Sequence, residues 1–270
     1  MHPVLFQIGS RPIYAWGVLL MIGFLLATWR AARNAPRYGI APEDLWDGAL
    51  FGLLGGIVGG RLVYVALAWD HFATRPAEIV QIWTGGMTSF GGLIGGVLAG
   101  LLVARLRKMN VADAADLTAV SLPIGYGIGR FGCFLNGCCH GGRCDLPWAV
   151  SFPHGDHGVP TGPVHPAQLY SVLASVIMFA VLVTVEKRRR FRGQLILLFS
   201  MMYGVYRFVV EFFREGVTAS LSGIAHLTQA QVACLLIVAG AAVLYALLAR
   251  RHAASAAPGG DAAPAAPSAS

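Results

Sequence analysis

The sequence predicts an all-α, polytopic membrane protein with seven transmembrane helices, its N-terminus outside and its C-terminus inside. The first observation is composition: 56% of the 270 residues are hydrophobic and 12% are charged, whereas about 25% of the residues of a soluble domain are charged. The second is a series of apolar stretches of about 20 residues, the length that crosses a bilayer as a helix. The third is the uneven distribution of lysine and arginine between the connections. Together they exclude an ordinary soluble enzyme, a disordered chain and a nucleic-acid-binding domain, in spite of the net charge of +7.

The predicted helices follow one another along almost the whole chain. They cover residues 12–29, 48–69, 84–104, 117–135, 166–185, 193–213 and 227–249. No basic segment precedes the first stretch, so we expect a retained helix rather than a cleaved signal peptide. The 34 glycines fit helices that pack closely in lipid through small residues.

Basic residues set the predicted orientation. Thirteen follow the first, third, fifth and seventh stretches: Arg30, Arg33, Arg37, Arg105, Arg107, Lys108, Lys187, Arg188, Arg189, Arg190, Arg192, Arg250 and Arg251. Four lie in the other connections: Arg11, Arg75, Arg143 and Arg214. Cytoplasmic loops carry the excess of positive charge, which places the N-terminus outside.

Two regions of different character are expected along the chain. Residues 1–252 form the seven-helix membrane domain, with an external loop over 136–165 where we expect the function to lie. Residues 253–270 are rich in alanine, proline and serine, which predicts a disordered cytoplasmic tail.

Three arginines lie inside predicted helices, namely Arg61, Arg130 and Arg207. They precede the outer ends of their stretches by eight, five and six residues, so at 1.5 Å per residue all three lie roughly 8–12 Å deep. A charge at the bilayer centre costs at least ~2.5–3.5 kcal/mol. Snorkelling to the headgroups, or structural pairing in the bundle, is the alternative for each one. Their similar depth favours a shared pocket for an anion, and the guanidinium fork matches the phosphate of a phospholipid headgroup.

Two further residues extend this candidate pocket. Glu211 is four residues after Arg207, and Arg214 is three further, so one helical face carries all three. Glu211 can orient Arg207 and leave donors for a ligand, or form a purely structural ion pair with it. Tyr64, one turn beyond Arg61, can add a hydroxyl group.

Four of the five cysteines fall close together near the end of the fourth stretch. They are Cys133, Cys138, Cys139 and Cys144, with His140 among them. The cluster contains no C-x-x-C pair, and adjacent cysteines are awkward joint ligands. We therefore expect no metal and no cofactor, and favour a disulfide or free thiols in an oxidising outer compartment.

Glycines are dense in 125–137 and again in 85–92. Glycine within a helix is tolerated where the helix breaks or where another backbone or a lipid comes close. The second run begins a predicted helix at the outer face, where a broken or re-entrant segment can line a cavity.

The run 129–141, Gly-Arg-Phe-Gly-Cys-Phe-Leu-Asn-Gly-Cys-Cys-His-Gly, resembles the signature of bacterial phosphatidylglycerol–prolipoprotein diacylglyceryl transferases. The segments 59–64, 85–95, 165–170 and 203–215 resemble further motifs of that family, in the same order. The resemblance implies a multi-pass enzyme of the bacterial cytoplasmic (inner) membrane. It would move diacylglyceryl from phosphatidylglycerol to the lipobox cysteine thiol of prolipoprotein signal peptides, forming a thioether and releasing glycerol 1-phosphate. A non-catalytic lipid-binding or lipid-transport protein on the same scaffold is the alternative.

The resemblance also implies roles for residues at matching positions. Arg130 and Arg207 would hold the lipid phosphate, with Glu211 orienting Arg207. Asn136 and Gly141 would shape the external turn. The expected substrate-binding residues further include Arg61, Tyr64 and His165, the residue that opens the 165–170 motif.

Three positions depart from the family pattern, which marks the chain as a divergent member. Phe90 stands where relatives usually place a histidine, the usual candidate base. Trp16 replaces a tyrosine, and Ser171 replaces an acidic residue.

Overall fold

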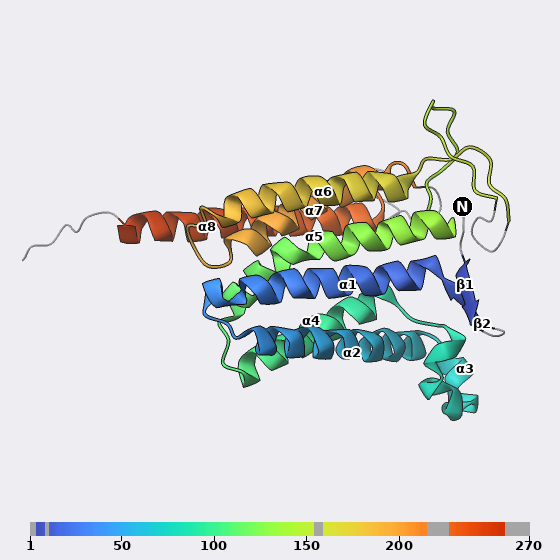
Figure 1. Cartoon of the computed structure of the whole chain (residues 1–270), viewed down its shortest axis with the longest axis horizontal. Coiled ribbons are helices and arrows are strands. Elements are labelled where there is room, and N and C mark those ends of the chain that lie inside the picture. The colour runs from blue at the N-terminus through green and yellow to red at the C-terminus, as the bar shows by residue number, and fades with distance from the viewer. Residues whose placement is uncertain (1–3, 9–10, 154–158, 215–226, 257–270) are drawn as a thin grey trace, which may run out of the picture.

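The computed structural model of the chain describes residues 4–8, 11–153, 159–214 and 227–256, and these are mostly helical (Figure 1). Among the described residues, seven long helices run side by side, one for each predicted stretch. They are α1 (Ala15–Asn34), α2 (Pro42–Leu67), α4 (Ser89–Leu106), α5 (Val111–Asn136), α6 (Ala167–Glu186), α7 (Gln194–Glu211) and α8 (Gln229–Ala256). Six of them are long and apolar enough to cross a membrane. The other, α5, falls outside this set because glycines, Pro123 and Arg130 lower its mean hydropathy.

Two helices begin at residues that differ from the start of the predicted apolar stretch, and capping or turn residues explain each difference. The first turn of α2 carries Glu43 and Asp44, favourable at a helix N-terminus, so this helix begins before the charge-free region. Gly85 and Gly86 adopt positive φ angles of 88° and 75°, which delays α4. The helix then begins after Thr88, whose Oγ1 accepts a hydrogen bond from the backbone N–H of Gly91 at 3.2 Å. The glycine run therefore makes a turn before α4 rather than a re-entrant helix.

Shorter elements join these helices. A hairpin of β1 (Val4–Ile8) and β2 (Arg11–Tyr14) precedes α1 and is a departure from the predicted all-α fold. The helix α3 (Trp69–Thr74) and the 3-10 turns η2 (Pro76–Val80) and η3 (Ile82–Thr84) connect α2 to α4, while η1 (Ala35–Tyr38) follows α1. Figure 1 places the hairpin, α3 and the long α5–α6 connection at one end of the bundle, here called the hairpin end. The C-terminal end of α8 lies at the opposite end. The first four residues of the predicted disordered tail, 253–256, are helical and belong to α8, and the rest of the tail lies outside the described residues.

The α2–α4 pair packs backbone against backbone. A Cβ built on Gly95 would lie 2.2 Å from the carbonyl oxygen of Gly55, and one on Gly59 would lie 2.4 Å from that of Gly91. Side chains larger than hydrogen would force the two helices apart. Interfaces of small residues of this kind let membrane helices approach closely.

The glycine run of α5 lies within one continuous helix, the central one of the bundle. A Cβ on Gly125 would lie 3.4 Å from the carbonyl oxygen of Gly23 on α1, and one on Gly127 would lie 3.0 Å from the Cβ of Ser175 on α6. The sequence left open whether these glycines mark a helix break or the close approach of another backbone or a lipid. The structure supports close approach of neighbouring helices.

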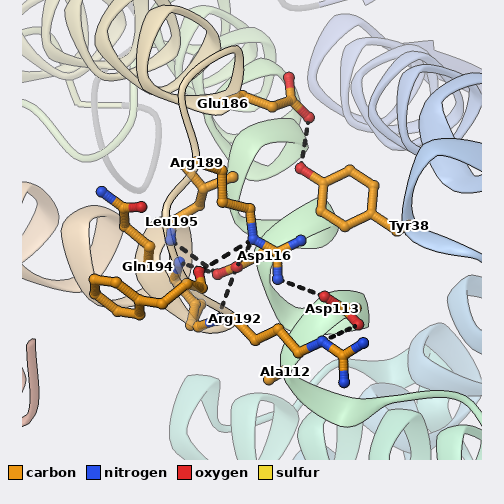
Figure 2. Close-up of polar contacts among 12 residues, drawn as sticks. Tyr38, Ala112, Asp113, Asp116, Glu186, Arg189, Arg192, Gln194 and Leu195 are labelled. Carbon is orange, nitrogen blue, oxygen red and sulfur yellow. Dashed lines mark hydrogen bonds and ion pairs between the residues drawn. The ribbon is translucent and has the colours of Figure 1, made fainter. Parts of the chain in front are cut away.

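A buried carboxylate joins α5 to the start of α7 (Figure 2). Asp116 is fully buried and accepts hydrogen bonds from the backbone N–H groups of Gly193 and Leu195 at 2.8 Å and of Ile196 at 2.9 Å. Its other neighbour is Arg189, whose Nε lies 2.9 Å away. The first N–H groups of a helix have no partner within the helix and carry partial positive charge, so a carboxylate there is well placed.

A second carboxylate and a tyrosine complete this network. Asp113 forms ion pairs with Arg189 and Arg192, the latter at 3.2 Å. The hydroxyl of Tyr38 donates to Glu186 at 2.9 Å (Figure 2). The end of the bundle opposite the hairpin is therefore fastened by buried polar contacts between η1, α5, α6 and α7.

The backbone contact between α2 and α4 predicts a sharp difference between two glycine substitutions in α4. Gly95→Val should destabilise the protein by ~1–3 kcal/mol or more through overpacking. Gly100→Ala should be neutral or stabilising, because nothing lies within 4 Å of a Cβ there and alanine favours helix by about 1 kcal/mol over glycine. Thermal unfolding of both variants in the same detergent measures this; equal stability would contradict the backbone contact.

Candidate anion-binding site

A small pocket opens at the hairpin end between α5, α6 and α7. Its lining is basic and polar, with three guanidinium groups. The lining residues are Arg130, Cys139, Ala167, Ser171, Tyr206, Arg207, Val210 and Arg214.

Two of the three intramembrane arginines, Arg130 and Arg207, meet in this pocket. The contact at Asp116 sets the position of both arginines along the bundle axis, because α5 and α7 run in the same direction from it (Figure 1). Arg130 follows Asp116 by roughly 21 Å of helix, and Arg207 follows Leu195 by roughly 18 Å, at 1.5 Å per residue. The expectation that these two arginines share a pocket agrees with this geometry.

The third, Arg61, is not brought into the pocket. It is 5% exposed, and its guanidinium donates to the backbone carbonyls of Glu78, Ile79, Gly85 and Gly86. Its guanidinium carbon also lies 5.7 Å from the ring centre of Tyr64. Equal depth therefore did not mean a shared site: Arg61 and Tyr64 fasten the α2–α4 connection, the structural pairing left open from sequence.

Among the described residues, three arginines line the pocket and one carboxylate, that of Glu211, faces them. Glu211, 4% exposed, forms an ion pair with Arg207 and accepts a hydrogen bond from Thr228 Oγ1 at 3.2 Å. Arg130 lies over the ring of Tyr126, 5.1 Å from its centre, and forms no ion pair within the described residues. Arg214 keeps a buried Nε that has no hydrogen-bond partner in the described part of the chain. Because an unsatisfied buried donor is costly, this arrangement suits a bound anion.

Hydroxyl groups form one wall of the pocket. Tyr206 donates to Ser171 Oγ, and the hydroxyl of Tyr126 lies 3.3 Å from that of Tyr206. Ser171 in turn donates to the carbonyl of Ala167 at 2.8 Å. Ser171 thus contributes a neutral hydroxyl group, and no negative charge, to the wall beside the arginines.

A thiol also reaches the pocket. Cys139 adopts a positive φ of 63°, unusual for a residue other than glycine. Hydrogen bonds from the thiols of Cys133 and Cys138, followed by the charges of Arg130 and Arg214, hold the pKa of Cys139 well below its usual range. Ser171, Tyr206 and Cys139 were not predicted as site residues, because their convergence depends on helix packing and on this turn.

The turn after α5 packs against the end of α7. Gly141 donates to the carbonyl of His165 at 2.8 Å, and a Cβ on it would lie 2.3 Å from the carbonyl oxygen of Phe213. Only glycine fits there, which agrees with a role for Gly141 in shaping the turn. Asn136 is the last residue of α5, at the start of that turn.

Neither the described histidines nor Phe90 and Trp16 are among the residues that line the pocket. His165 Nδ1 is 3.2 Å from the hydroxyl of Tyr170, and its ring packs on Phe213. His140 stacks on Phe152 with ring centres 5.7 Å apart. Phe90 is 74% exposed on α4. A histidine at position 90 would therefore project from α4, not from the helices that carry the arginines.

Comparison with known proteins identifies the family of the chain. The family model described as prolipoprotein diacylglyceryl transferase matches residues 3–247. A phosphatidylglycerol–prolipoprotein diacylglyceryl transferase of Mannheimia succiniciproducens is 39% identical over 221 residues, covering 79% of this chain and 80% of its own. Those of Pasteurella multocida and Geobacter sulfurreducens are 41% and 39% identical, each over 79% of this chain and over 79% and 82% of their own lengths. The chain, a multi-pass membrane protein, belongs to the prolipoprotein diacylglyceryl transferase family.

Proposed function

We propose that the protein transfers diacylglyceryl from phosphatidylglycerol to the lipobox cysteine of prolipoproteins. The thiolate sulfur attacks the glyceryl carbon that carries the phosphate oxygen. A carbon–sulfur bond forms, the carbon–oxygen bond breaks, and its electron pair leaves on glycerol 1-phosphate. The observation that carries the proposal is the pocket lined by Arg130, Arg207 and Arg214, which face one carboxylate among the residues that the structure describes.

The arginines act on charge that appears during the reaction. As the carbon–oxygen bond breaks, negative charge grows on the leaving phosphate. Arg130 and Arg207 donate to its oxygens from fixed positions, and donors fixed before the reaction stabilise the transition state more than mobile water does. Glu211 is a positioning residue that keeps Arg207 in one orientation. Asn136, Gly141 and His165 shape the external turn beside the pocket, where the acceptor peptide enters.

An apolar groove suits the acyl chains of the donor. It has a volume of about 490 Å³ and lies between α1, α5 and α6. Ile128 and Phe131, next to Arg130 in sequence, belong to its lining, as does Ser175, one turn after Ser171. A lipid with its phosphate at the arginines can lay an acyl chain along this groove.

The topology that fits this chemistry has seven transmembrane helices in the bacterial inner membrane, with the N-terminus and the hairpin end outside. The basic residues at the C-terminal ends of α1, α4 and α8, and in the connections that follow α1, α4 and α6, then lie in the cytoplasm. Residues 1–252 make up the transferase domain, and the segment 253–270 extends into the cytoplasm. Prolipoproteins present their lipobox cysteine on the outer side, where the pocket opens.

A complementation experiment tests the function and the two arginines together. In a strain depleted of its own transferase, the wild-type chain should restore growth and add a diacylglyceryl mass to a reporter lipoprotein. Arg130→Lys and Arg207→Lys should each lower turnover at least tenfold, because lysine keeps the charge but loses the two-pronged donor. Arg105→Lys, at the opposite end of the bundle, is the matched control and should behave as wild type. Lipid binding without rescue would favour the non-catalytic alternative, and full activity of both pocket variants would refute the phosphate role.

The ion pair on α7 predicts non-additive kinetics. Arg207→Gln and Glu211→Gln should each reduce the initial rate with a lipobox peptide and phosphatidylglycerol. The double variant should lose little more than either single one, with an interaction free energy of about 0.5–3 kcal/mol. Strictly additive losses would mean that Glu211 does not act through Arg207.

The acceptor thiol predicts a rate that rises with pH. A thiol with a pKa near 8.5 is mostly protonated at neutral pH, so the rate should climb about 25-fold from about pH 7 to about pH 9 as the thiolate population grows. The positive field of Arg130, Arg207 and Arg214 favours the thiolate form. His140→Ala and His165→Ala should keep the same slope. A flat wild-type profile that either substitution abolishes would identify that histidine as the base.

A further inference from the structure

Three thiols converge beside the arginine pocket. The sulfur atoms of Cys133, Cys138 and Cys139 all lie within 4.8 Å of one another, and all three cysteines are free. Cys133 is buried in the last turn of α5, and the other two are half-buried just after it. The sequence argues against such a cluster, because adjacent cysteines normally project in different directions.

The backbone of the turn explains the convergence. Gly137 ends α5 with a φ of 78°, and Cys138 donates its N–H to the carbonyl of Cys133 at 3.2 Å. Cys139 then adopts its own positive φ of 63°. The chain thereby folds back on the helix, and both adjacent thiols face Cys133. From α6, Gln168 Nε2 donates to the carbonyl of Cys138 at 2.8 Å and holds the turn in place.

We propose that Cys133, Cys138 and Cys139 bind a d¹⁰ metal ion, zinc or monovalent copper, through three thiolates. Soft sulfur ligands select these metals. With a metal–sulfur bond of about 2.3 Å, ligand sulfurs lie about 3.8–4.0 Å apart, so the cluster needs only a small contraction. His140 does not belong to the sulfur cluster, and a fourth ligand to zinc would be water.

The surrounding charges suit such a site. Three thiolates around a monovalent or divalent cation keep a net negative charge. Arg130, one turn before Cys133, and Arg214, which lines the pocket with Cys139, supply positive charge next to it. A bound ion would join the turn to the end of α5. Through Gly141 it would also fix the contact of the turn with Phe213, just after α7. The site is therefore structural and does not depend on the proposed reaction.

Metal content of the purified full-length protein tests the proposal. The protein, kept in detergent with a non-thiol reductant, is loaded with Zn²⁺ or with Cu⁺, desalted and analysed by elemental mass spectrometry. One ion per chain is expected, and the metal that survives competition with a chelator distinguishes zinc from copper. Cys133→Ser, Cys138→Ser and Cys139→Ser should each lower the bound metal at least tenfold. The matched controls Cys144→Ser and Cys234→Ser, whose thiols lie outside the cluster, should keep it.

A second measurement needs no variant. The loaded and metal-free wild-type proteins are alkylated, digested and examined by mass spectrometry. Metal should protect the three cluster thiols and leave Cys144 reactive. Protection absent from the cluster, metal retained by the serine variants, or a disulfide between two of the three cysteines in protein taken directly from membranes would each overturn the proposal. If the wild-type protein binds one metal ion through the cluster but shows no transferase activity, that result counts against the proposed function alone.

Discussion

The contact between Asp116 and the first N–H groups of α7 is the constraint on which the rest of the structure depends. It is buried, it joins two helices that are distant in sequence, and Arg189 neutralises its charge. Removing one partner of a buried ion pair leaves an uncompensated charge and costs about 3–5 kcal/mol. The same contact sets the axial register of α5 against α7. A shift of one helical turn, about 5.4 Å, would separate Arg130 from Arg207 and abolish the pocket at the far end of the bundle.

Buried arginines have two different roles in this bundle: one fastens the backbone, and others remain available to an anion. Arg61 donates four hydrogen bonds, out of the five N–H donors of its guanidinium, to backbone carbonyls of the α2–α4 connection, which leaves little for a ligand. Among the described residues, Arg214 keeps a buried Nε without a hydrogen-bond partner, and Arg130 forms no ion pair. The difference lies in what surrounds each guanidinium: irregular backbone offers carbonyl acceptors, whereas regular helices have already used theirs. A pocket walled by helices is therefore the place where an arginine stays available to an anion.

Much of this architecture could be predicted from sequence, because membrane helices are specified by length and hydropathy alone. The seven stretches correspond to seven long helices, and the depth of Arg130 and Arg207 correctly anticipated that they meet. Depth says nothing about lateral position, which is why Arg61 was grouped with them and lies elsewhere. The hairpin before α1 was missed since its residues merge into an apolar stretch. The convergence of Cys138 and Cys139 was missed because a positive φ at a residue other than glycine leaves no compositional trace.

The glycine contacts between α2 and α4 determine where the bundle can part. Two helices that touch backbone to backbone have no side chains that could rotate aside, so this seam behaves as a closed wall. A two-chain lipid moving sideways from the bilayer needs a seam whose lining can yield. The boundary of α1, α5 and α6, which is lined by flexible aliphatic and aromatic side chains, meets that requirement. If lipid enters the proposed site from the bilayer, the α1–α5–α6 boundary is therefore a better route than the α2–α4 seam.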